Sequence, residues 1–184
     1  MGTKSTDMLE EEHRVIQKVV GVLAAMAEAL ETGGELESDT LRDIVDFMRT
    51  FADKCHHGKE ETHLFPLLVE KGIPVQGCPM AVLNHEHQQG RALVASLADA
   101  AEDLERGDPK ARESLLTNLQ NLTALYPNHI WKEDYLLFPM VNKILDPKEQ
   151  EDLSGKFEKV EEVVGREVHE RFVRLAERLE VRSG

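Results

Sequence analysis

A short unit that occurs twice in the chain constrains the fold more than any other feature. Residues 56–66 (HHGKEETHLFP) and 129–139 (HIWKEDYLLFP) each place a glutamate four residues after a histidine and end in Phe-Pro. Two residues four apart lie one turn from each other on the same side of an α-helix. The repeat therefore predicts two helices, each with a histidine and a glutamate side by side on one face.

The rest of the chain shows the same helical periodicity. Apolar residues recur three and four positions apart, and no segment has the sustained alternation of a strand, so we expect an all-α protein. The expected helices, separated by glycine and proline breaks, cover residues 7–31, 38–70, 80–106, 109–144 and 147–181. Residues 1–146 are expected to form a bundle, and residues 147–184 a C-terminal helical extension that packs on the bundle or on a partner.

Histidines lie on the inward face of each of the first four helices. Each residue advances about 100° around a helix axis, which aligns four histidines with the apolar stripes of their helices: His13, His56, His87 and His129. His85 lies about 160° from His87 and is expected on the surface. The heights agree as well, because the first two lie 18 residues, and the other two 19 and 20 residues, from the hairpin ends of their helices. Antiparallel packing therefore brings all four to one layer.

A layer of imidazoles and carboxylates inside an apolar bundle requires a common partner. Burying such groups is costly unless they are paired or bind a metal. Imidazole and carboxylate ligands suit first-row transition metals, a carboxylate spans two ions, and di-iron sites are built in bundle cores from facing helices. We therefore interpret six residues as ligands of a metal centre: His13, His56, Glu60, His87, His129 and Glu133.

The same motifs give the chain a resemblance to the hemerythrin-like, or HHE cation-binding, family over about residues 7–144. The matching segments are the Glu-Glu-His that ends at His13, the two repeats, and EHQQGR from Glu86. The resemblance implies an up-down-up-down four-helix bundle and the same six ligands. It also implies a non-heme centre of two iron ions, oxo- or hydroxo-bridged when oxidised, that binds or reacts with oxygen.

The third helix departs from the oxygen-carrying branch of that family, which has a second histidine there, one turn from the first. Leu83 and Arg91 occupy the positions one turn from His87. His57 is the candidate for the missing metal ligand, since it lies about 100° from His56 at the edge of the apolar stripe. The iron-sensing F-box relative is similar in using a residue at this position. The alternative is that His57 is a boundary residue bonded to a neighbouring helix.

Five other residues, near the expected layer or in the last helix, have open roles. Glu61 is expected at the surface or behind a ligand, although a register shifted by one residue would make it a ligand itself. His63 is expected to orient a ligand, to gate access, or to lie at the edge of the core. Cys55 and Tyr126 either tune redox behaviour or only pack, and His169 is expected on the surface.

Composition limits which binding partners and which cellular compartment we expect. The formal net charge of -13 repels nucleic-acid phosphates and anionic lipid surfaces, so we expect neither a nucleic-acid nor a membrane partner. No segment approaches the roughly 18 uninterrupted apolar residues of a membrane span, and the N-terminus has no apolar signal segment. Cys55 and Cys78 form no CxxC pair and are expected as reduced thiols in a cytoplasmic protein. The last helix is the expected surface for a homodimer or another protein partner.

Three functions compete. The leading one is a di-iron protein that binds or reacts with dioxygen, peroxide or nitric oxide, as a sensor, a scavenger or an oxidoreductase acting on peroxide or dioxygen. The alternative is an iron-responsive regulatory or storage module without redox turnover. A structural bundle with zinc or no metal is the third, and it leaves the convergence of ligands without a purpose.

Overall fold

The computed structural model describes residues 4–183, which form helices joined by short loops, with no strand among them. The helical segments follow one another as α1 (Ser5–Glu31), α2 (Ser38–Phe47), η1 (Met48–His57), η2 (Glu60–Leu64), α3 (Phe65–Glu70), α4 (Met80–Glu105), α5 (Ala111–Lys132), η3 (Glu133–Leu137), α6 (Phe138–Ile144), α7 (Pro147–Val164) and α8 (Arg166–Ser183). The η segments are π-helical. Across the described part of the chain, no helix combines the length and the apolar character that crossing a membrane requires.

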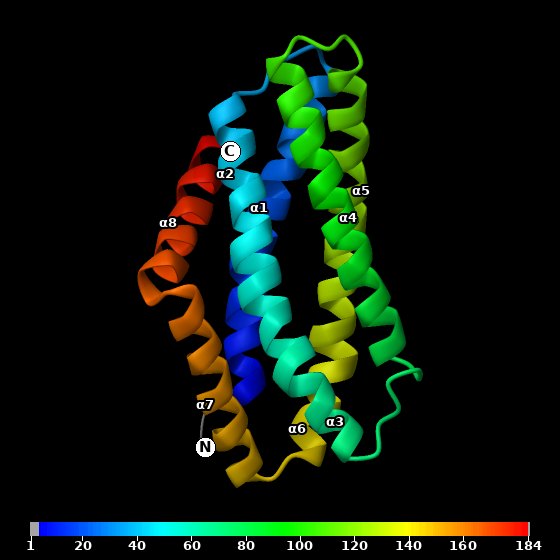
Figure 1. The fold of residues 1–184 in the computed structure, drawn as a ribbon, viewed down its shortest axis with the longest axis vertical. Helices are drawn as coiled ribbons and strands as arrows, with labels where there is room; N and C mark the ends of the chain where they lie inside the picture. Colours follow the sequence, from blue (N-terminus) through cyan, green and yellow to red (C-terminus); the bar gives the residue numbers. More distant parts are fainter. Residues whose placement is uncertain (1–3, 184) are drawn as a thin grey trace.

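Four long rods run alternately up and down the molecule (Figure 1). α1 and α4 are single helices, whereas the second rod is the run from α2 to α3 and the fourth is the run from α5 to α6. α5 packs along both α4 and α1, and α8 packs along α1. The predicted all-α, up-down-up-down four-helix bundle is therefore confirmed.

Buried apolar side chains form two clusters that a polar layer separates. In α1, Leu9 belongs to the smaller cluster and Ile16 to the larger one, and His13 lies between them. In the other three rods the expected ligands also lie between the two clusters, except that His129 lies beside Ile130 at the edge of the larger one. Polar groups in this layer are therefore shielded from water on both sides along the bundle axis.

The ligand repeats contain π-helical turns. η1 ends at His57, η2 begins at Glu60, and η3 begins at Glu133. A π-helix forms i→i+5 hydrogen bonds, so its turn holds more residues than an α-helical turn, and such segments often occur at functional sites. An α-helical wheel places His57 at the edge of the apolar stripe, whereas the structure buries it.

Two helices begin at other residues than the sequence predicts. α1 begins two residues before the expected Asp7, whose carboxylate accepts a hydrogen bond from the backbone nitrogen of Lys4 at 2.8 Å. α5 begins two residues after the expected residue 109. Asp108 accepts a hydrogen bond from the backbone nitrogen of Lys110 at 2.8 Å, which stabilises a turn ahead of the helix.

The C-terminal extension forms two helices, so the prediction of a single helix there is wrong. Gly165 separates α7 from α8 with a φ of 103°, which glycine adopts because it has no Cβ to clash. The predicted cap of α7 is confirmed, because Asp146 accepts hydrogen bonds from the backbone nitrogens of Lys148 and Glu149, both at 2.9 Å. Both helices lie along the bundle (Figure 1). Four buried residues of α8 belong to the larger core cluster: Phe172, Leu175, Ala176 and Leu179.

Candidate metal centre

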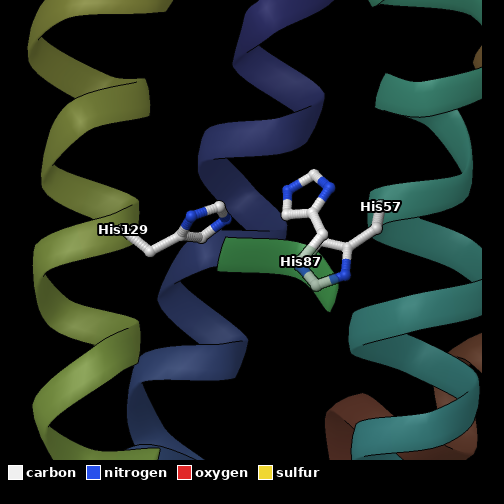
Figure 2. Close-up of side chains that lie close together, drawn as sticks. All are labelled: His57, His87 and His129. Carbon is white, nitrogen blue, oxygen red and sulfur yellow. The ribbon is translucent and has the colours of Figure 1, made fainter. Parts of the chain in front are cut away.

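The structure brings the seven candidate ligands into one buried layer as two adjoining groups. We name them site A, formed by His13, His56, Glu60 and Glu133, and site B, formed by His57, His87 and His129. Within each site the ligand atoms lie within 4.8 Å of one another. Figure 2 shows the three site B imidazoles converging from η1, α4 and α5. None of the seven residues is more than 3% exposed, so the whole ligand set is buried.

The two glutamates lie between the sites. Glu133 directs Oε2 toward site A, 3.1 Å from Nε2 of His13, and Oε1 toward site B, 3.3 Å from Nε2 of His129. Glu60 Oε2 lies 3.8 Å from Nε2 of His56 and 3.5 Å from Nε2 of His87. Each carboxylate therefore faces imidazoles of both sites, which is the arrangement that a shared, bridging ligand requires.

All five imidazoles turn Nδ1 toward a carboxylate outside the layer. The pairs are His13 with Asp134 at 2.7 Å, His56 with Glu12 at 3.0 Å, His57 with Asp53 at 3.4 Å, His87 with Glu61 at 2.7 Å, and His129 with Glu86 at 3.0 Å. A carboxylate that accepts the Nδ1 proton fixes the tautomer and the ring orientation. Nε2 is then the nitrogen that faces the layer and that a metal would bind.

Sequence reasoning missed most of these outer carboxylates. Four of the five are adjacent in the chain to a ligand, but each one serves a ligand on another helix. Glu12, for example, follows the chain next to His13 but accepts from His56. Glu61, whose role was open, accepts from His87 and from Arg91, and the structure places Glu60 in the layer.

The lysine of each repeat was also missed, although both repeats carry it three residues after the histidine. Lys59 Nζ lies 2.6 Å from Glu12 Oε1, and Lys132 Nζ lies 2.6 Å from Glu86 Oε1. Each lysine therefore binds the carboxylate that orients the histidine of its own repeat. The aligned lysines were the available signal, but their partners lie on other helices.

Several atoms of the layer are buried without a hydrogen-bond partner among the described residues. They are both carboxylate oxygens of Glu60, both of Glu133, Nε2 of His87 and Nε2 of His129. A buried polar group left unpaired costs about 1–3 kcal/mol, and more when it is charged. Converging lone pairs of nitrogen and oxygen fit first-row transition-metal ions, so the residues present fit a two-metal centre.

Electrostatics in the layer separate the two carboxylates. Burial and the neighbouring Glu133 raise the pKa of Glu60 well above its usual range. Burial opposes ionisation of Glu133 too, but the imidazoles of His129 and His13 hold its pKa well below the usual range. Burial and the charge of His13 lower the pKa of His56 to about 4, which keeps that imidazole neutral at pH 7. A neutral imidazole is the form that binds a metal.

The remaining histidines lie outside the layer. His85 is exposed, as predicted. His63 is half-buried and lines a surface hollow between η1 and α7. His169, which was predicted on the surface, is partly exposed but also contacts the bundle: its ring is 4.9 Å from that of Phe51, and its Nε2 is 3.4 Å from Glu12 Oε1. Its partners come from other helices, so local sequence could not reveal them.

The two cysteines and Tyr126 have defined surroundings. Cys55 is buried with Sγ 3.6 Å from Glu12 Oε1, and burial raises the pKa of its thiol to about 12. Cys78 is exposed, and both cysteines are free. Tyr126 is buried with its ring centroid 6.5 Å from that of His129, and it lines a cavity of about 240 Å³ that also borders His57.

Comparison with known proteins assigns the chain to a protein family. The chain matches the family model described as Hemerythrin HHE cation binding domain over residues 4–141. Curated relatives include uncharacterized proteins of Mycobacterium bovis and Mycobacterium tuberculosis, each 24% identical over 150 residues, or 82% of this chain and 58% of the relative. The chain thus spans little more than half the length of these relatives. No solved structure matches it significantly. The matched region includes the whole ligand layer and ends before α7.

Proposed function

Because the chain belongs to the hemerythrin HHE cation-binding domain family, we propose that it is a non-heme di-iron protein that binds or reacts with dioxygen, peroxide or nitric oxide. One observation carries the proposal: five imidazoles and two carboxylates meet in a buried layer, and both carboxylates and the Nε2 atoms of His87 and His129 have no hydrogen-bond partner among the described residues. Site A and site B provide for two ions, with Glu60 and Glu133 between them. Nitrogen and oxygen ligands of this kind suit iron in its ferrous and ferric states.

The chain contributes orientation and exclusion of water. The five Nδ1 contacts hold the imidazoles with Nε2 inward, and the two apolar clusters above and below the layer keep bulk water away. Bound iron supplies redox chemistry with small oxygen or nitrogen species. The cavity of about 240 Å³ beside His57 offers room for such a ligand next to site B.

Sensing or peroxide removal is favoured over reversible oxygen carriage. Leu83 and Arg91 occupy the positions one turn from His87 where a carrier has another histidine. Arg91 is engaged with Asp53 at 2.7 Å and with Glu61 at 2.9 Å, so it supports the outer carboxylates instead. If turnover occurs, the protein is an oxidoreductase acting on peroxide or dioxygen. Both cysteines are free, which supports a cytoplasmic location.

An iron-responsive regulatory or storage module is the second candidate. The unpaired buried atoms of Glu60 and Glu133 favour it, because a fold with such groups gains stability from the metal itself. Metal removal separates the two candidates. A regulatory module loses much of its helical signal without metal, whereas a redox protein keeps its fold and changes its absorption.

The direct experiment is to purify the protein without air, load it with ferrous iron, and record metal content and absorption. Two ions per chain and new visible bands on exposure to air, peroxide or nitric oxide are expected. His56→Ala should abolish the response, and His85→Ala serves as the matched control because that histidine is exposed. Protein that binds two zinc ions but shows no spectral response with iron would refute the redox proposal.

A further inference from the structure

Lys59 is a fully buried lysine that is not among the candidate metal ligands. A buried ammonium is costly unless carboxylates pair with it. Lys59 has two such partners: Nζ lies 2.6 Å from Glu12 Oε1 in α1 and 2.6 Å from Glu161 Oε1 in α7. Glu161 lies in the C-terminal extension, beyond the residues that match the family model. The extension therefore completes a charge network inside the bundle.

That network ends on a ligand of site A. The same Glu12 that binds Lys59 faces Nδ1 of His56 with Oε2 at 3.0 Å. His169 in α8 adds a second contact from the extension, with Nε2 3.4 Å from Glu12 Oε1. A continuous series of contacts thus runs from α7 and α8 through Glu12 to the ring of His56.

The second repeat provides an internal comparison. Lys132 holds Glu86 at 2.6 Å, and Glu86 faces Nδ1 of His129 in site B at 3.0 Å, as in the first repeat. Lys132 is 26% exposed, however, and its other hydrogen bond goes to the backbone of Asn128 in its own helix, at 3.2 Å. Site B therefore has an equivalent lysine and carboxylate, but among the described residues its lysine makes no hydrogen bond or ion pair with α7 or α8.

A third metal ion does not account for this cluster. Glu12, Cys55 and His169 place ligand atoms within 4.8 Å of one another, a spacing that a metal would fit. The ammonium of Lys59 is already 2.6 Å from the carboxylate of Glu12 and supplies the positive charge there. A second cation at the same oxygen would be repelled.

We propose that the C-terminal helices position His56 through Glu161, Lys59, Glu12 and His169, so that the packing of α7 and α8 on the bundle strengthens metal binding at site A and leaves site B largely unaffected. The inference rests on the proposed function, in that both sites are taken to bind metal ions. Glu161 and His169 act as positioning residues, since neither reaches the layer itself.

The test titrates the metal-free full chain with cobalt(II) against a competing chelator, and follows absorption to resolve the two ions. Glu161→Gln removes one charge with little change of shape, and His169→Phe keeps the ring beside Phe51 but removes the contact with Glu12. Each variant should lower the affinity of site A for cobalt(II) about 10- to 100-fold, which is the range found for residues that orient metal ligands. The affinity of site B should remain within about twofold of the wild-type value.

Two controls assign the effect. Glu158→Gln, an exposed change on the same helix as Glu161, should leave both affinities as in wild type. Lys132→Gln should instead lower the cobalt(II) affinity of site B, because Lys132 acts on that site through Glu86. Unchanged affinities in both Glu161→Gln and His169→Phe would overturn the inference. Equal weakening of both ions together with a lower melting temperature of the metal-free protein would also overturn it, because that result indicates a structural role only.

A readout that needs no metal separates this inference from the proposed function. Nitrogen NMR of the metal-free protein reports whether His56 keeps its proton on Nδ1. Wild type should show that single tautomer, and Glu161→Gln a mixture. Wild type that fails to bind two ions refutes the proposed function, whereas an unchanged His56 tautomer in both variants refutes the positioning role.

Discussion

Glu60→Gln is expected to weaken metal binding while stabilising the metal-free protein. Glu60 is fully buried between the two sites, and neither of its carboxylate oxygens has a hydrogen-bond partner within residues 4–183. Burial and Glu133 raise its pKa, so the metal-free protein at pH 7 either takes up a proton on folding or buries a charge. A neutral amide avoids that cost but cannot bridge two ions with the same charge.

The expected sizes follow from these contacts. An unpaired buried group costs about 1–3 kcal/mol, and the amide still leaves polar atoms unpaired, so the net gain in unfolding free energy should be about 1–2 kcal/mol. For a chain of this length that corresponds to a rise in melting temperature of about 2–8 °C. Metal affinity should fall about 100-fold or more, beyond the range of about 10- to 100-fold for outer carboxylates, since Glu60 faces both sites.

The pH dependence of the effect has a defined sign. Unfolded Glu60 ionises around its ordinary value of 4.5, whereas folded Glu60 keeps its proton to higher pH. The stability that this group contributes is therefore fully present below pH 4.5 and is lost as the pH rises through the folded pKa. The advantage of Glu60→Gln should thus grow above that pH and vanish below it.

The assay is thermal unfolding of chelator-treated protein, followed by circular dichroism, together with cobalt(II) affinity by chelator competition. Glu61→Gln is the matched control, because Glu61 supports His87 and pairs with Arg91 outside the layer. It should lower the stability of the metal-free protein and weaken metal binding less than Glu60→Gln does. A metal-free Glu60→Gln protein that melts below wild type, or a larger metal loss from Glu61→Gln, would refute this account of the layer.

Three further predictions follow from individual side chains. His87→Ala should remove most bound metal and His85→Ala should not, as metal analysis after dialysis will show; equal losses would mean that α4 presents a different face. As the pH falls from about 6.5 to about 4, the metal-free wild type should lose up to about 3 kcal/mol of unfolding free energy relative to His56→Gln, because only unfolded His56 takes up a proton in that range. Urea titrations at several pH values measure this difference, and parallel pH dependences of the two proteins would contradict the prediction. Native protein should react with one equivalent of a thiol reagent at exposed Cys78, and buried Cys55 only after unfolding; fast reaction of both would contradict the burial.

The sequence by itself determined the four rods of the bundle and the set of inward-facing polar residues. Helical periodicity is a local property, so the apolar stripes and the histidines on them could be assigned without knowing how the helices pack. Similar distances from the hairpin ends then placed four histidines at one height, and the structure has them in one layer. The exposure of His85 was predicted on the same local basis.

Only the tertiary structure decided which group serves which ligand. Glu12 is adjacent to His13 but orients His56, and Lys59 binds carboxylates from both α1 and α7. Such pairs depend on how the rods rotate against each other, and the π-helical turns change that rotation from the one an α-helical wheel assumes. The turn at Gly165, which divides α7 from α8, likewise sets where His169 meets the bundle. Contacts between distant segments are determined by packing of the whole chain, so no local pattern in the sequence encodes them.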